Sequence, residues 1–266
     1  MDRVGIIAGN GRFPIILAKE ITKKGDIPVI AALKEEADPQ LEILCQSFQW
    51  LALGKLQQII NYFKAENVTN VIMAGQVKHR QLFAGLSLDL RAIKLLAGLV
   101  NKKADSILSA VANELQKDGI TLLPSHTYLQ QLLATKGQLS GERISKEEMI
   151  DAEFGFNIAK QTGAIDIGQT VVVKDKTIVA VEAMEGTDEC IKRAASLAGE
   201  GFVVVKVSKP NQDMRFDIPV IGINTIKTLS ETKAGIIVIE AGATLMIDKE
   251  EVIAMANEKG IKIYAL

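Results

Sequence analysis

The feature that most constrains this chain is an alternation of short apolar runs with longer amphipathic runs over residues 1–134. Parallel strands covered by helices on both faces are apolar at nearly every position. Runs of this kind lie at 4–8, 28–33, 48–53, 71–74 and 120–123, and helical spacing lies at 13–24, 55–67, 88–101, 105–117 and 125–134. The alternation predicts an α/β domain with a doubly wound parallel sheet.

The second half of the chain has a different pattern. Residues 135–148 are polar, contain two glycines and lack apolar periodicity, which predicts a linker. Beyond it, helices are expected at 148–161, 188–197 and 249–259, and strands at 170–173, 177–181, 202–207, 235–240, 244–247 and 262–265. The first two of these strands are separated by only three residues, which indicates an antiparallel hairpin. Residues 149–266 are therefore predicted to form a second α/β domain with a mixed sheet.

Charge and composition exclude several classes of protein. The net charge of −1 provides no general attraction for nucleic acid. The two cysteines, Cys45 and Cys190, form no disulfide scaffold and favour a reducing cytoplasm. The chain enters a strand-like run at once, leaving no room for a signal peptide, and no apolar run reaches the roughly 18–20 residues of a membrane helix. We therefore expect a soluble cytoplasmic protein.

Histidine is scarce, since His79 and His126 are the only two in the chain. A dinuclear phosphoesterase centre needs several histidine ligands beside its carboxylates. Any metal here would be held by oxygen atoms, which favours Mg²⁺.

A glycine loop follows the first apolar run. Gly9, Asn10 and Gly11 precede a predicted helix that has Pro14 in its first turn. Glycines allow a ligand to approach the backbone, and a helix N-terminus attracts phosphate. A plain strand-to-helix turn is the alternative interpretation. The third glycine of a dinucleotide fingerprint is missing at Pro14, so NAD binding is weakly supported. Gly75 and Gln76 follow another strand and form a second candidate for ligand contact.

The most distinctive local pattern is the run KVSKPNQDMRFD at residues 206–217. If the run is extended after Pro210, Asp213, Arg215 and Asp217 share one face. Two carboxylates and an arginine could hold Mg²⁺ and clamp a phosphate, with Lys206 and Lys209 offsetting its negative charge. The alternative is an edge strand that exposes charged side chains to water.

A further loop lies between a predicted strand and a predicted helix. It contains Glu185, Gly186, Thr187 and Asp188. Helix amides and a carboxylate here could contact a phosphate or a metal. Simple capping of the helix by Thr187 or Asp188 is the alternative. Capping is also the expected role of Asp105, and His126 is expected to be structural.

These segments together resemble the LpxI family of UDP-2,3-diacylglucosamine pyrophosphatases. The matching runs lie at residues 5–14, 74–77, 166–169, 181–188, 206–222 and 240–242, in the family's order along almost the whole chain. The long run at 206–222 is specific, whereas the glycine loop is not. Where the family usually has Gly-Asp-Asp, this chain has Lys103-Ala104-Asp105, so only Asp105 carries over.

The resemblance implies a Rossmann-like N-terminal domain, a linker and a catalytic C-terminal domain. It implies Mg²⁺-dependent hydrolysis of UDP-2,3-diacylglucosamine to UMP and 2,3-diacylglucosamine 1-phosphate (lipid X) in lipid A biosynthesis. The essential aspartate of the family corresponds to Asp217. By the same resemblance a homodimer and transient contact with the inner-membrane surface are expected.

Roles can be suggested for the candidate residues. Asp217 with Asp213 or Glu185 would bind Mg²⁺ or orient water, while Lys206, Lys209 and Arg215 would steady the phosphates. The uridine half would contact Gly9, Asn10, Gly11, Gly75 and Gln76. Two other functions stay open: an NAD(P)-dependent oxidoreductase, from the glycine loop, and a carrier of lipids or nucleotide sugars.

Overall fold

The computed structural model describes residues 1–77, 88–100 and 103–266, which fall into two compact units. The first unit consists of Met1–Leu129 together with Asp213–Asp217. The second consists of Gln130–Gln212 and Ile218–Leu266. A five-residue piece of the C-terminal half thus belongs, by its contacts, to the N-terminal unit.

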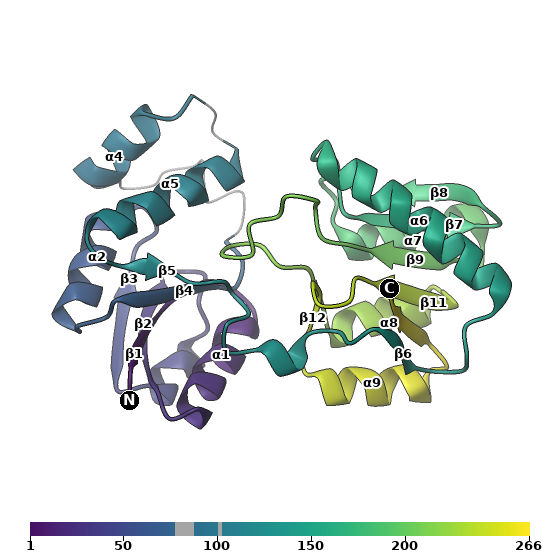
Figure 1. The fold of residues 1–266 in the computed structure, drawn as a ribbon, viewed down its shortest axis with the longest axis horizontal. Coiled ribbons are helices and arrows are strands. Elements are labelled where there is room, and N and C mark those ends of the chain that lie inside the picture. The colour runs from purple at the N-terminus through teal and green to yellow at the C-terminus, as the bar shows by residue number, and fades with distance from the viewer. Residues whose placement is uncertain (78–87, 101–102) are drawn as a thin grey trace. The chain divides into compact units, whose positions relative to one another are not determined.

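The first unit is built on a parallel sheet of five strands (Figure 1). The strands are β1 (Arg3–Ala8), β2 (Ile27–Leu33), β3 (Ser47–Leu51), β4 (Asn70–Ala74) and β5 (Thr121–Leu122). Their order is β3-β2-β1-β4-β5, and every pairing is parallel. The predicted doubly wound sheet is confirmed. The order reverses direction between β1 and β4, where ligands bind in open α/β sheets.

Helices pack on both faces of this sheet. The helical elements are α1 (Phe13–Lys23), η1 (Pro39–Leu44), α2 (Leu56–Ala65), α4 (Leu90–Ala97) and α5 (Ala104–Lys117). Side chains of α2, α4 and α5 form one core with Val29 and Val71. Leu17 and Ile21 of α1 are fully buried, and so are Ile6 and Ile30, which alternate with Val29 and therefore point to the other face of the sheet. This alternation explains why the strands are apolar throughout.

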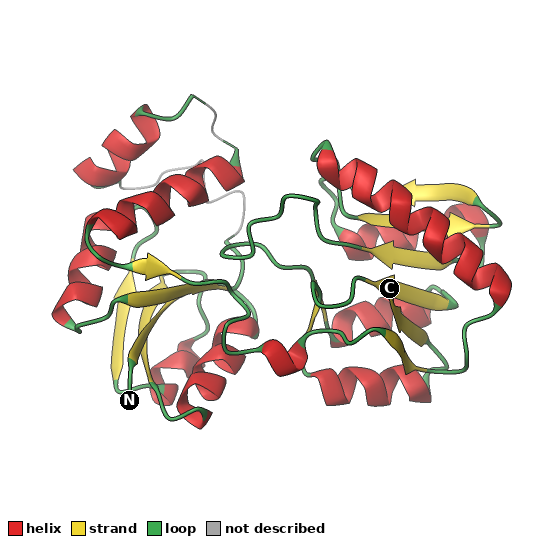
Figure 2. Cartoon of the chain, viewed as in Figure 1, coloured by secondary structure: helices red, strands yellow, loops and turns green. Residues whose placement is uncertain are grey.

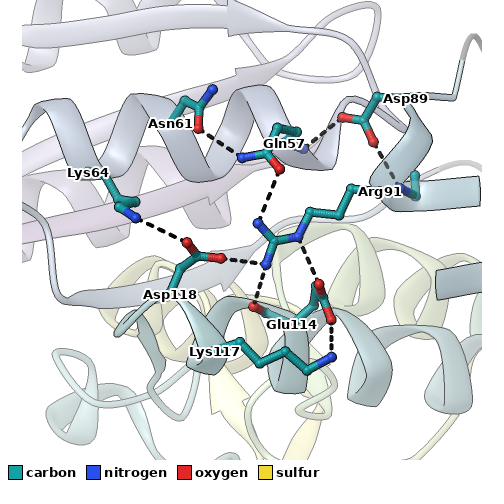
Figure 3. A network of polar contacts seen from close by, with 9 residues as sticks. Gln57, Asn61, Lys64, Asp89, Arg91, Glu114, Lys117 and Asp118 are labelled. Atoms are coloured by element: carbon teal, nitrogen blue, oxygen red, sulfur yellow. Dashed lines mark hydrogen bonds and ion pairs between the residues drawn. The ribbon is translucent and has the colours of Figure 1, made fainter. Parts of the chain in front are cut away.

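Arg91 of α4 connects three helices (Figure 3). Its guanidinium donates to Glu114 of α5 at 2.8 Å and to Gln57 of α2 at 3.2 Å, and it pairs with Asp118. Asp89 caps α4 by accepting from the amide of Ala92 at 2.8 Å. The Arg91 side chain is only 19% exposed, so these bonds hold α4 against its neighbours in a partly desolvated setting.

The second unit is built on a mixed sheet of six strands. These are β6 (Gly137–Ser140), β7 (Thr170–Lys174), β8 (Thr177–Val181), β9 (Val203–Lys206), β11 (Ile236–Ile239) and β13 (Lys262–Ala265), in the order β6-β13-β11-β9-β7-β8. Strands β9, β11 and β13 are parallel to one another. Strand β7 pairs antiparallel with β8 and β9, and β6 pairs antiparallel with β13. The predicted mixed sheet and the β7–β8 hairpin are confirmed. A separate two-stranded sheet pairs β10 (Val220–Ile221) with β12 (Leu245–Met246).

Four helices cover the second sheet. They are α6 (Lys146–Ala164), α7 (Thr187–Ala198), α8 (Ile223–Glu231) and α9 (Lys249–Glu258). Helix α6 packs on one face and the other three on the opposite face. Gly155 lets α6 approach closely, because a Cβ there would lie 2.7 Å from side-chain atoms of Val173 and Val205. None of the described helices combines the length and the apolar character that a bilayer crossing requires.

Two local predictions are wrong, and one helix was missed. The helix expected at 125–134 is a series of turns ending in η2 (Gln130–Leu132). Its backbone bonds, such as Leu129 to His126, span three residues, while the amide of Ser125 bonds to Met214. The segment 135–148 contains strand β6 rather than only a linker. Helix α8 was not anticipated, because its β-branched residues have low helix propensity and Gly222 provides no side-chain cap.

The run at 213–217 is not extended. Between β9 and β10 the chain is loop and turn (Figure 2). The amides of Phe216 and Asp217 both donate to the carbonyl of Asp213, at 3.2 and 3.3 Å. The alternating face expected for Asp213, Arg215 and Asp217, and the edge-strand alternative, are therefore both wrong. We call residues 213–217 the 213–217 turn.

Candidate functional site

The loops after β1 and β4 are joined at the switch point of the first sheet. The amide of Asn10 donates to the carbonyl of Gln76 at 2.7 Å, and the amide of Gln76 donates to the carbonyl of Asn10 at 3.0 Å. A Cβ on Gly9 would lie 2.5 Å from the Gln76 oxygen, and one on Gly75 would lie 2.5 Å from the Asn10 oxygen. The close contact between the two loops therefore requires glycine at positions 9 and 75, whether or not a ligand binds there.

Gly11 differs from these two glycines. It is exposed, has a φ of +98°, and a Cβ there would meet no atom within 4 Å. It precedes the N-terminus of α1, where no described side chain caps the first turn. A helix start with uncapped amides attracts negative charge. Gly11 and Gly186, the latter at the start of α7, leave open space beside such amides, whereas Gly9 and Gly75 do not.

The 213–217 turn carries a closed ion pair. The carboxylate of Asp213 accepts from the amide of Arg215 at 3.1 Å and from its guanidinium at 2.6 to 3.1 Å. These bonds lower the pKa of Asp213, with the Arg215 side chain as the largest cause. Asp213 and Arg215 are thus together as predicted, through a turn instead of a strand face. Asp217 is partly buried in the same turn.

A polar cluster lies in the second unit where β8 and β9 end. Lys206 is only 9% exposed, and its ammonium donates to the hydroxyl of Thr187 at 3.0 Å. That hydroxyl donates to Oε1 of Glu182 at 3.0 Å. Oε2 of Glu182 is buried and has no hydrogen-bond partner within the described part of the chain. A lysine and a threonine at a helix start can contact an anionic oxygen, while the carboxylate can accept from a hydroxyl or a water.

A second ion pair lies at the end of β11. The ammonium of Lys160 donates to both oxygens of Glu240, at 2.7 and 2.6 Å. Glu240 also accepts from the amide and the hydroxyl of Ser208, both at 2.7 Å. Burial raises the pKa of Glu240, but the bonds from Lys160 and Ser208 outweigh it and lower the pKa. These contacts secure the loop that leaves β9.

The other predicted residues of the second unit have separate partners. Lys209 bonds to Asp166 at 2.6 Å. Glu185 accepts from Arg193 at 2.5 Å, and this bond is the largest cause of its lowered pKa. Gly186 is the N-cap of α7 with a φ of +84°, and Asp188 lies in the first turn of that helix. The structure therefore brings Thr187 to Lys206, whereas Lys209 and Glu185 join other pairs.

No preformed metal centre is found in the described ranges, where no three acidic, histidine or cysteine side chains converge. Of the predicted ligands, Asp213 and Asp217 belong to the first unit and Glu185 to the second. The carboxylate of Asp213 already pairs with Arg215, and that of Glu185 pairs with Arg193. This donor set does not fit a protein-only metal cage. It is compatible with Mg²⁺ held mainly by substrate phosphates and water, with one or two carboxylates.

Asp105 and His126 were expected to have structural roles. Asp105 lies exposed in the first turn of α5, whose N-cap is Lys103, so Asp105 is not the cap that was expected. Burial lowers the pKa of His126. Lys78 and His79, which follow Gly75 and Gln76, lie outside the described residues.

Comparison with known proteins identifies the family. The sequence profile of the LpxI N-terminal domain matches residues 3–132, and that of the LpxI C-terminal domain matches residues 135–264. The chain belongs to the LpxI family. A curated member, the UDP-2,3-diacylglucosamine pyrophosphatase LpxI of Caulobacter vibrioides, is 33% identical over 98% of this chain and 96% of its own length. Both halves of the chain are thus shared with that LpxI protein.

One solved structure aligns with this chain at low similarity. The phosphoribosylglycinamide synthetase of Anaerococcus prevotii aligns with a TM-score of 0.28 and 11% identity, covering 76% of this chain and 44% of that protein. A similarity at this level supports no statement about the site.

Two polar residues were missed by sequence reasoning, Lys160 and Ser125. Lys160 forms one cluster with Ser208 and Glu240, and Ser125 bonds to the 213–217 turn. Glu182 and Glu240 were recognisable from the sequence, because each is a carboxylate at the end of an apolar strand. Ser125 and Lys160 gave no such signal, because their partners are 90 and 80 residues away in sequence.

Proposed function

We propose that this chain hydrolyses the pyrophosphate of UDP-2,3-diacylglucosamine to UMP and 2,3-diacylglucosamine 1-phosphate (lipid X), within lipid A biosynthesis. The observation that carries the proposal is the Caulobacter relative of that name, which aligns with this chain over 96% of its own length. A protein that shares both halves with a pyrophosphatase has the same set of strands and loops on which to build its site.

The chemistry requires neutralisation of the diphosphate. Its anionic oxygens repel an attacking water, and fixed cations lower this barrier. Lys206 fits the role because Thr187 holds its ammonium at 3.0 Å in a buried setting. Arg215 is likewise oriented by Asp213. In this proposal Lys206, Lys209 and Arg215 stabilise the charge that develops on the phosphates.

Asp217 is the proposed catalytic carboxylate, which orients the attacking water or accepts its proton. The activity is proposed to depend on Mg²⁺, which when bound would offset phosphate charge and polarise the anhydride. Support for an oxygen-ligated ion comes from the scarcity of histidine in the chain. Asp213 and Glu185 would bind the ion only after giving up their ion pairs with Arg215 and Arg193.

The nucleotide half is assigned to the switch-point loops. Gly11 and Asn10 are exposed beside the start of α1, and Gln76 is bonded to Asn10. In the proposal these loops, with Gly9 and Gly75, contact the uridine and its phosphate. Gly186, Thr187 and Asp188, at the start of α7, are proposed to contact the diphosphate.

The substrate carries acyl chains, so we propose a cytoplasmic protein with transient contact at the inner-membrane surface. We also propose a homodimer, which sedimentation of the purified protein would test. Liposome flotation with and without substrate would test the membrane contact.

One assay tests the function. Purified protein is incubated with UDP-2,3-diacylglucosamine, and UMP and lipid X are quantified with Mg²⁺, with EDTA, and with EDTA followed by excess Mg²⁺. We expect release of both products with Mg²⁺, loss with EDTA and recovery on readdition. Substrate binding without UMP release would instead identify a carrier. Binding of NAD(P) without UMP release would identify an oxidoreductase.

A further inference from the structure

The 213–217 turn belongs to the first unit, whereas the residues before and after it in the sequence belong to the second. Gln212 and Ile218 are grouped with the second unit, whereas Asp213–Asp217 are grouped with the first. Asp217 therefore takes its position from contacts with the first unit. Those contacts decide where the proposed catalytic carboxylate lies.

Ser125 makes the principal polar contacts to this turn. Its amide donates to the carbonyl of Met214 at 2.8 Å. Its hydroxyl lies 2.9 Å from the carbonyl of Arg215 and 3.2 Å from the carbonyl of Met73 in β4. Ser125 is only 1% exposed, so water does not compete for these bonds. The hydroxyl has one proton, and the carbonyl of Arg215 is the nearer acceptor, so one buried residue bonds to two successive carbonyls of the turn beside the carboxyl end of β4.

The 213–217 turn is braced by contacts among its own residues. Asp213 binds both the amide and the guanidinium of Arg215. The amide of Asp217 donates back to the carbonyl of Asp213 at 3.3 Å. Phe216 packs against the core of the first unit, with the Arg215 guanidinium 5.1 Å from its ring. Anchoring the carbonyl of Arg215 therefore also anchors Asp217, two residues later.

We propose that Ser125 is a positioning residue for Asp217, acting through the hydrogen bond from its hydroxyl to the carbonyl of Arg215. This inference rests on the proposed function of Asp217. Ser125 touches neither substrate nor metal in this scheme. Its hydroxyl sets the location of the carboxylate relative to the end of β4.

The test compares Ser125→Ala with a matched control, Ser140→Ala. Ser140 is also buried, at 4% exposure, and its hydroxyl donates to the carbonyl of Ile261 at 3.0 Å in the second unit. Both changes remove one buried hydroxyl-to-carbonyl bond, so both should lower the melting temperature to a similar degree. Only Ser125→Ala should lower kcat, by about tenfold or more, with little change in KM, because displacing a reacting group weakens the chemical step.

Two further measurements guard against misfolding and against failure of the assay. Ser125→Cys keeps the side-chain volume but has only a weak S–H donor, so its kcat should fall between wild type and Ser125→Ala. Hydrogen exchange at the amides of Phe216 and Asp217 should be faster in both Ser125 variants than in Ser140→Ala. This readout does not require turnover.

The outcomes separate this inference from the proposed function. Wild-type kcat in Ser125→Ala or Ser125→Cys overturns the inference while the function stands, as does an equal loss in Ser140→Ala. If the wild-type protein releases no UMP, the proposed function fails. Unchanged exchange at Phe216 and Asp217 then overturns the anchoring role as well.

Discussion

The ammonium of Lys206 and the carboxylate of Glu182 are linked through one hydroxyl, that of Thr187, which lies 3.0 Å from each. The ammonium has only donors, so the hydroxyl accepts from Lys206 and gives its single proton to Glu182. The direction of both hydrogen bonds is therefore determined. It orients a buried cation where β9 ends and α7 begins.

This arrangement predicts a catalytic loss when the cation is removed. Lys206→Met keeps the aliphatic stem and deletes the charge, so we expect kcat/KM for UMP release to fall by about 10²-fold or more. Lys174→Met is the matched control, since Lys174 of β7 donates to the carbonyls of Ala198 and Glu200, both at 2.8 Å, outside the proposed site. Comparable losses in the two variants would contradict a specific role for Lys206.

Replacement of Asp217 by Asn should remove turnover and spare the fold. The amide is isosteric with the carboxylate but cannot accept a proton or carry charge, so we expect kcat to fall by about 10²- to 10⁴-fold. The measurement is UMP release beside a thermal unfolding curve. Asp175→Asn, in the β7–β8 turn with a φ of +50°, supplies the control, because asparagine tolerates that conformation. Turnover by Asp217→Asn near the wild-type rate would exclude the carboxylate from catalysis.

Gly75 and Gly25 offer a matched pair for the contact between the switch-point loops. Both have a φ of +88°, but a Cβ at Gly75 meets backbone at 2.5 Å, while one at Gly25 meets nothing within 4 Å. Alanine at either position carries strain of about 1 kcal/mol. At Gly75 the clash should add about 1–3 kcal/mol to the loss in free energy of unfolding, as measured in urea. Equal losses would show that backbone strain alone accounts for the glycine.

The Lys160–Glu240 pair should stabilise the second unit in a pH-dependent way. The pKa of Glu240 is lower when folded than when unfolded, despite burial, because of bonds from Lys160 and Ser208. Its contribution is therefore complete above the ordinary glutamate pKa of about 4.3 and is lost as the pH falls through the folded pKa. Glu240→Gln should cost about 2 kcal/mol at neutral pH and less at acidic pH. A cost that stays constant from neutral to acidic pH would contradict this assignment.

Local sequence patterns were sufficient wherever burial is periodic. The apolar run at 71–74 predicted β4, and the short connection at 174–176 predicted the β7–β8 hairpin. Their side chains meet the core on the period of the element itself, which adjacent residues reveal. The glycines of the first loop were recognised too, but the crowding of Gly9 against Gln76 depends on the loop after β4, which is distant in sequence.

The sequence by itself determined the two α/β sheets, the family and the residue types available for phosphate chemistry, because these follow from local periodicity and from motifs. Only the tertiary structure decided that residues 213–217 form a turn and are grouped with the first unit. It alone also assigned Thr187 to Lys206 and Glu240 to Lys160. The physical reason is that partners distant in sequence satisfy these buried polar groups, and their hydrogen bonds override the local alternation that favoured a strand.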